Sequence, residues 1–86
     1  MNKYELKVKL DELGISSKNY SLDGTLKPVR IILLFSEFKW WTFEYDEHGN
    51  IEAKKQFETE DEACQDMLRR LINLKEWRKK HNLKDH

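Results

Sequence analysis

The sequence has few of the residues on which secreted, metal-bound or membrane-bound small proteins depend. Its 86 residues include one cysteine, one proline and three glycines. A single cysteine cannot form an intrachain disulfide, so we expect a chain that works in a reducing compartment. No run approaches the ~20 apolar residues of a membrane helix, and the first residues lack the apolar centre of a signal peptide. We therefore expect a soluble cytoplasmic domain.

Net charge is also absent, because sixteen Lys and Arg residues balance sixteen Asp and Glu residues. A dedicated DNA-binding module normally has a basic surface, so this balance argues against one. There is no phosphate-binding glycine-rich loop, and no serine combines with a histidine and an acid in a recognisable arrangement. Cys64, His48, His81 and His86 lack metal-ligand spacing. The sequence therefore predicts no enzyme, no metal and no other cofactor.

Two helices are indicated by apolar spacing and by their ends. In residues 2–13, leucines recur at helical spacing, and Gly14 with Ile15 predicts a Schellman ending. A second helix is predicted over residues 60–80, with Thr59 as its N-cap and Glu62 completing a capping box. Residues 81–86 are predicted to be a frayed tail.

Three strands are predicted between the helices, at residues 29–36, 40–46 and 51–57. A three-residue loop at 37–39 would pair Phe35 with Trp41 and place Trp41, Phe43 and Tyr45 on the core face. The loop 47–49 has Gly49 at a left-handed position, which makes Tyr45 oppose Ile51. The fold predicted for the single domain 1–86 is α+β, in the order α-β-β-β-α. It is a three-stranded antiparallel meander with both helices packed on one face.

This register leaves the other face of the sheet open, and we predict that a partner binds there. The candidate residues are Ile32, Leu34, Trp40, Thr42 and Glu44 on the strands, and Asp46, Glu47 and His48 at the hairpin tip. Adjacent exposed apolar side chains usually mark an interaction site, and Trp is the commonest hot spot. The alternatives are a homodimer through this face or through the edge of the first strand, and a face covered by the loop 16–27.

Charge is segregated along the second half of the chain. Residues 44–66 contain nine acids and two lysines, whereas residues 67–86 contain seven Lys and Arg residues and two acids. One interpretation is an acidic patch that mimics nucleic acid for a protein partner. The other is internal neutralisation, because the last helix is long enough for its basic end to return to the acidic hairpin tip.

Three blocks of sequence together resemble a group of small bacterial proteins. They are Tyr20 to Gly24 (YSLDG), Trp41 to Gly49 (WTFEYDEHG) and Phe57 to Cys64 (FETEDEAC). The chain resembles the small immunity-protein families of bacterial polymorphic toxin systems over roughly residues 4–75. The resemblance implies a cytoplasmic, non-catalytic protein whose partner is one cognate toxin, commonly a nuclease. A structural or regulatory homodimer and a small nucleic-acid-associated protein are the alternatives.

Overall fold

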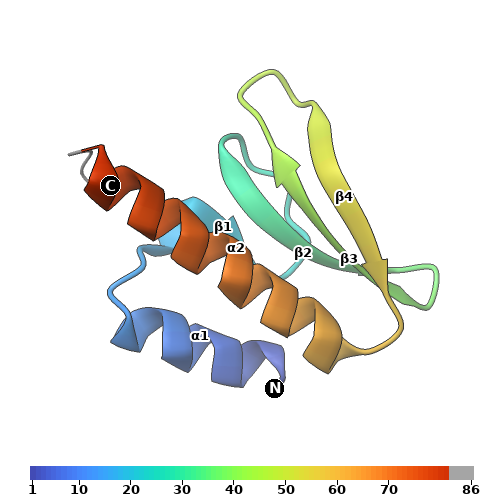
Figure 1. The fold of residues 1–86 in the computed structure, drawn as a ribbon. Coiled ribbons are helices and arrows are strands. Elements are labelled where there is room, and N and C mark those ends of the chain that lie inside the picture. The colour runs from blue at the N-terminus through green and yellow to red at the C-terminus, as the bar shows by residue number, and fades with distance from the viewer. Residues whose placement is uncertain (82–86) are drawn as a thin grey trace.

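The computed structural model describes residues 1–81 and contains two α-helices and a four-stranded sheet (Figure 1). In chain order the elements are helix α1 (Lys3–Glu12), the 3-10 turn η1 (Ser17–Asn19), strands β1 (Tyr20–Ser21), β2 (Arg30–Ser36), β3 (Lys39–Tyr45) and β4 (Ile51–Phe57), and helix α2 (Glu60–Lys80). The α+β class and the five long elements are confirmed, each within one residue at either end. Of the predicted tail, residues 82–86 lie outside the described residues.

The sheet is mixed, which corrects the predicted three-stranded antiparallel meander. Strand β1 pairs in parallel with β2, with Tyr20 opposite Ile31 and Ser21 opposite Ile32. Arg30 supports this pairing, because its Nη1 donates to the carbonyl of Ser17 at 3.1 Å. β1 therefore covers part of the β2 edge that the sequence predicts to be free. A two-residue strand is too short for its pattern to be recognised in a sequence.

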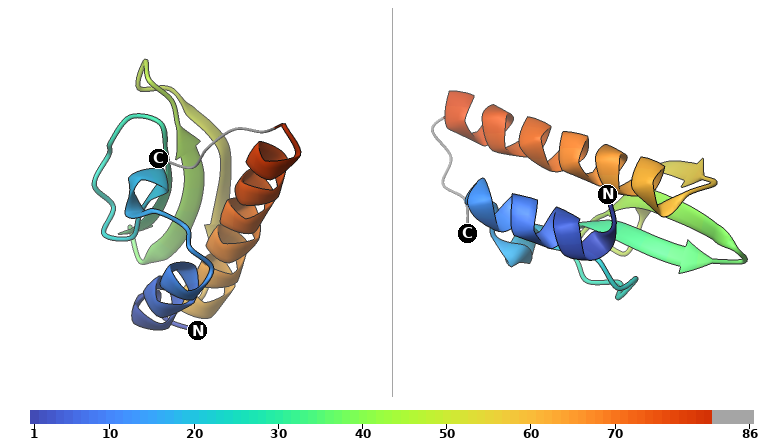
Figure 2. Two further views of the ribbon diagram at one scale, coloured as in Figure 1. Left: turned by 90° about the vertical axis from the view of Figure 1, so that its left-hand side faces the viewer. Right: turned by 90° about the horizontal axis from the view of Figure 1, so that it is seen from below.

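Both helices contribute to one core on one face of the sheet (Figures 1 and 2). Helix α2 lies across the sheet, and α1 lies beside α2. The sheet supplies Ile31 and Leu33 to this core. The helices supply Leu6, Leu10, Ala63, Cys64, Met67 and Leu71. The predicted placement of the helices on a single face is confirmed.

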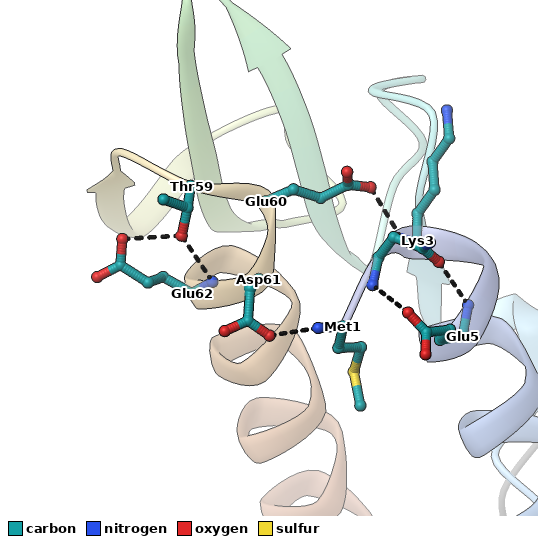
Figure 3. A network of polar contacts seen from close by, with 8 residues as sticks. Met1, Lys3, Glu5, Thr59, Glu60, Asp61 and Glu62 are labelled. Carbon is teal, nitrogen blue, oxygen red and sulfur yellow. Dashed lines mark hydrogen bonds and ion pairs between the residues drawn. The ribbon is translucent and has the colours of Figure 1, made fainter.

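The first turns of the two helices are joined by polar contacts (Figure 3). The backbone amide of Lys3 donates to Glu60 Oε2 at 2.9 Å, and the N-terminal ammonium contacts Asp61. The Thr59 hydroxyl caps α2 by accepting from the Glu62 amide at 3.2 Å, as predicted. The Glu62 side chain differs from the prediction, since it accepts from the Thr59 hydroxyl at 2.9 Å instead of returning to the backbone.

The end of α1 is the Schellman motif that the sequence predicts. Gly14 has φ +71° and donates to the carbonyl of Asp11, and Ile15 donates to the carbonyl of Leu10 at 2.9 Å. These two bonds satisfy carbonyls that have no partner within the helix. Leu10 and Ile15 are both buried, so the motif also turns the chain back into the core.

The register of β2 on β3 differs from the prediction by one residue. Ser36 pairs with Lys39, so the loop is the two-residue turn Glu37-Phe38, with φ +56° and +62°. Two left-handed residues match a type I′ turn, which usually contains Asn or Gly. Neither is present here, so the sequence gives no sign of this turn. As a result Phe35 opposes Trp40 instead of Trp41.

The one-residue shift exchanges the two faces of β3. Trp40, Thr42 and Glu44 face the helices together with Ile31 and Leu33. The predicted core residues Trp41, Phe43 and Tyr45 lie on the opposite face, with Ile32 and Leu34. This opposite face is not open, because Ile32 and Phe43 are fully buried.

The segment between β1 and β2 covers that second face (Figure 2). A Cβ placed on Gly24 would lie 2.7 Å from Leu34 Cδ1, so the segment is packed closely on the sheet there. Covering by the loop was the alternative to a free binding face, and the structure supports it for Ile32 and Leu34. Tyr20, at the start of this segment, instead belongs to the core on the helix side.

The β3–β4 hairpin agrees with the prediction at its tip. Gly49 has φ +80°, and Tyr45 opposes Ile51. Further along, a bulge shifts the register between Thr42 and Glu44, with Ala53 at φ +52°. Lys55 therefore opposes Thr42, and Lys54 lies 4.5 Å above the Trp41 ring.

The turn Glu37-Phe38 can be tested by giving it the residues that its backbone favours. Because non-glycine residues at positive φ are strained by about 1–2 kcal/mol, Glu37→Asn with Phe38→Gly should stabilise the protein by about 1 kcal/mol in urea unfolding. Phe38→Ala is the control, since it removes the exposed ring and keeps the left-handed strain. A neutral or destabilising effect of the double change would contradict the two-residue turn.

The cover over the sheet can be tested by a double-mutant cycle. Gly24→Ala should destabilise the protein both through its φ of +81° and through contact with Leu34. The loss of stability that comes from the contact with Leu34 should disappear in a Leu34→Ala background. The coupling energy between the two substitutions should therefore be at least about 0.5 kcal/mol. Gly14→Ala is the control, because it has a similar φ and only Lys75 Nζ, at 3.9 Å, near its added Cβ. Equal coupling of Leu34 to both glycines would refute the contact.

Candidate protein-binding surface

The structure divides the eight predicted binding residues among three places. Ile32 and Leu34 lie beneath the loop that precedes β2, and Ile32 is fully buried. Trp40, Thr42 and Glu44 lie on the helix side, and Thr42 is fully buried. Asp46, Glu47 and His48 lie in the β3–β4 hairpin loop. The predicted single face centred on Trp40 is therefore wrong, and neither Ile32 nor Thr42 is accessible to a partner.

Thr42 and Glu44 take part in a buried polar network beneath α2. The Thr42 hydroxyl donates to Asp66 Oδ2 at 2.7 Å, and Arg70 Nε donates to the same oxygen at 2.7 Å. Arg70 also donates through Nη2 to the carbonyl of Ala53 at 2.5 Å. Its Nη1 lies 3.7 Å from Glu44 Oε2. One arginine thus joins the helix to β3 and to the bulge of β4.

Asp66 remains ionised inside this network. Burial opposes its charge, but hydrogen bonds from Thr42, Arg69 and Arg70 outweigh burial and lower its pKa to about 2. Sequence reasoning missed the pair Asp66 and Arg70, although their i, i+4 spacing within the apolar stripe of the last helix is a usable signal.

A groove lies between the C-terminal half of α2 and the sheet. Ile31 and Leu74 provide apolar walls. Four carboxylates line the groove, from Glu44, Asp46, Glu47 and Glu52, and they outnumber its two guanidinium groups, from Arg30 and Arg78. Its volume is about 380 Å³. The groove brings together three predicted binding residues, Glu44, Asp46 and Glu47, and adds Glu52. We call it the acidic groove.

The acids of this groove are only partly neutralised. Glu44 has the 3.7 Å contact to Arg70, and Glu52 forms no ion pair within residues 1–81. Hydrogen bonds from the backbone of Asn50, then from its side chain and from His48, lower the pKa of Asp46 and keep it ionised. The groove therefore presents negative charge beside apolar surface.

The basic half of α2 meets acids of the sheet at the acidic groove, which Arg78 lines together with Asp46 and Glu47, so internal neutralisation stays a prediction. In Figure 1 the helix crosses the sheet obliquely, and its last turn lies away from the turn that joins β3 to β4. Arg78 Nη1 donates to Asn19 Oδ1 at 2.7 Å, which holds this turn over η1. Arg78 thus lines the acidic groove on the side opposite the hairpin.

A second exposed surface lies at the other end of the sheet. Phe38 is 91% exposed at the tip of the β2–β3 turn, and Phe35 is more than half exposed. The rings of Phe35 and Trp40 are 4.8 Å apart, so Trp40 supports this aromatic end from the core side. Large exposed rings at a strained turn are unusual unless a partner covers them.

The cysteine and histidines occupy unrelated places. Cys64 is buried in the core, and burial raises the pKa of its thiol to about 11. His48 lies 3.4 Å from Glu47, and His81 stacks on Trp77 with a centroid distance of 4.3 Å. His86 lies outside the described residues. Within residues 1–81, no group of three or more His, Cys, Asp or Glu side chains is placed to hold a metal ion.

Comparisons with known proteins return no relative. No family model, no curated protein and no solved structure matches this chain. Across residues 1–81, neither helix has the length and apolar character needed to span a bilayer.

The Asp66 network predicts an acid-sensitive fold. The pKa of Asp66 is about 2 in the folded state and near 3.9 when unfolded, so its contribution is complete above about pH 4. It is lost as the pH falls towards 2, and it amounts to about 2 kcal/mol. The free energy of unfolding measured from pH 5 to 2 should fall more steeply for wild type than for Asp66→Asn. If the free energy of unfolding fell equally with pH in the wild type and in Asp66→Asn, the network would not be what keeps Asp66 ionised.

Proposed function

We propose that this protein is a cytoplasmic, non-enzymatic immunity protein that neutralises a cognate bacterial toxin by binding it directly. The resemblance of its three sequence blocks to small immunity proteins supports this function. The observation that carries the proposal is the acidic groove, where carboxylates without full neutralisation stand beside apolar side chains. Such a surface has the composition of a site for a cationic protein partner.

The chemistry of the groove favours a nuclease toxin as the partner. A nuclease binds phosphates with Lys and Arg side chains, so its working surface is basic. Carboxylates at an accessible groove would attract that surface and accelerate association, while Ile31 and Leu74 would supply apolar contact. Binding there would block access of nucleic acid to the toxin without any catalysis by this chain.

Self-association through the aromatic end is the second candidate, and the exposure of Phe38 favours it. A homodimer would cover the rings of Phe35 and Phe38, whereas the acidic groove would repel a second copy of itself. The two functions therefore use different ends of the molecule. The third reading, nucleic-acid association, is disfavoured by the acidic groove.

The proposal is tested with the toxin encoded beside this gene. Glu47→Lys with Glu52→Lys should weaken toxin binding at least tenfold in a titration at low salt, and should reduce protection of cells that express the toxin. Wild-type affinity should fall as salt is raised, because the attraction is electrostatic.

Glu12→Lys with Glu76→Lys is the matched control, because both acids are exposed and neither lines the groove. The groove assignment fails if the two double variants bind alike. The immunity function fails if no neighbouring toxin binds at all. The homodimer is tested by sedimentation of the wild type and of the double variant Phe35→Ser with Phe38→Ser. A dimeric wild type and a monomeric variant would support the homodimer, and a monomeric wild type would exclude it.

A further inference from the structure

A basic pocket lies between α1 and the segment that joins β1 to β2, and it adjoins the acidic groove at Arg30, which lines both. Its volume is about 460 Å³, which is within the range of small-molecule sites. Four cationic side chains from three parts of the chain line it: Lys3 and Lys7 from α1, Lys27 from the loop, and Arg30 from β2. The net charge of zero conceals this local excess.

The positive charge in the pocket is largely uncompensated. Lys7 is paired with Asp11 at 2.6 Å, but within residues 1–81 neither Lys27 nor Arg30 forms an ion pair. Asp23 is the one acid among the lining residues. Its carboxylate accepts from the Ser21 hydroxyl and the Thr25 amide, both at 3.0 Å, which directs it into its own loop.

The pocket is rich in hydrogen-bond donors. Arg30 is held in place by the carbonyls of Ser17 and Tyr20, at 3.1 and 3.5 Å from Nη1, and its other N–H groups remain available. Tyr20 is 4% exposed, and its buried hydroxyl makes no hydrogen bond. The Lys7 ammonium interacts with that hydroxyl, because Asp11 first and then Tyr20 raise the pKa of Lys7. Buried hydroxyls without a partner are rare, so a ligand acceptor is a natural partner for this one.

We propose that this pocket binds a small phosphorylated molecule, whose phosphate accepts hydrogen bonds from Lys27, Arg30 and the Tyr20 hydroxyl. An acceptor-only group of charge near −2 matches a set of donors with no acid partner. The pocket is larger than a phosphate ion, and Tyr4, 73% exposed on its wall, offers a ring for the organic part of the ligand. The inference is independent of the proposed immunity function.

The test is a titration of the ¹⁵N-labelled protein followed by amide NMR shifts, with adenosine monophosphate, inorganic phosphate and adenosine as separate probes. Both phosphate-containing probes should saturate and shift amides in residues 20–30, whereas adenosine alone should not. Tighter binding of the nucleotide than of inorganic phosphate would show that the organic part adds contact. Equal affinities would limit the site to the phosphate itself, and no saturable shift with either phosphate would overturn the proposal.

Two variants separate ligand binding from general electrostatics. Lys27→Gln should weaken phosphate binding several-fold, while Lys80→Gln, which removes an exposed charge on α2, should leave it unchanged. Tyr20→Phe should also weaken binding several-fold without lowering the thermal midpoint of the ligand-free protein, because it removes only an unbonded hydroxyl. If Lys27→Gln and Lys80→Gln weakened binding equally, the binding would be non-specific electrostatic attraction. If Tyr20→Phe bound with unchanged affinity, the Tyr20 hydroxyl would not contact the phosphate.

Discussion

The interaction on which the rest of this structure depends is the buried contact among Thr42, Asp66 and Arg70. A carboxylate and a guanidinium beneath a helix are stable only if nearly every polar atom has a partner. Thr42 supplies one partner from β3, and the carbonyl of Ala53 supplies another from the bulge of β4. These two hydrogen-bond partners are available only when Thr42 and Glu44 lie on the side of β3 that faces the helices. The register, the bulge and the position of α2 are therefore mutually dependent.

Much of the fold could be predicted because its boundaries depend on local signals. The Schellman ending at Gly14, the N-cap at Thr59 and the hairpin at Gly49 each need particular residues within one turn of the chain, and each is found where the sequence places it. The β2–β3 register could not be predicted in the same way. Its turn uses Glu37 and Phe38 in conformations that these residues rarely adopt.

The alternation of side chains could not correct this error, because both faces of the sheet are buried. Alternation indicates the core face when the other face meets water. Here Ile32 and Phe43 are covered by the loop before β2, while Ile31 and Leu33 are covered by the helices. With apolar residues needed on both sides, the more regular pattern of Trp41, Phe43 and Tyr45 favours the wrong face. The predicted binding face rested on the same wrong register, and of its residues only Glu44, Asp46 and Glu47 line one groove.

A sheet covered on both sides leaves only its margins for recognition, and this is where the charged features are found. Because α2 crosses the sheet obliquely, it leaves the acidic groove beside the β3–β4 hairpin. Because the loop before β2 must cross the second face, it forms the basic pocket against α1. The acidic groove and the basic pocket thereby adjoin each other at Arg30, on a small domain whose total charge is zero.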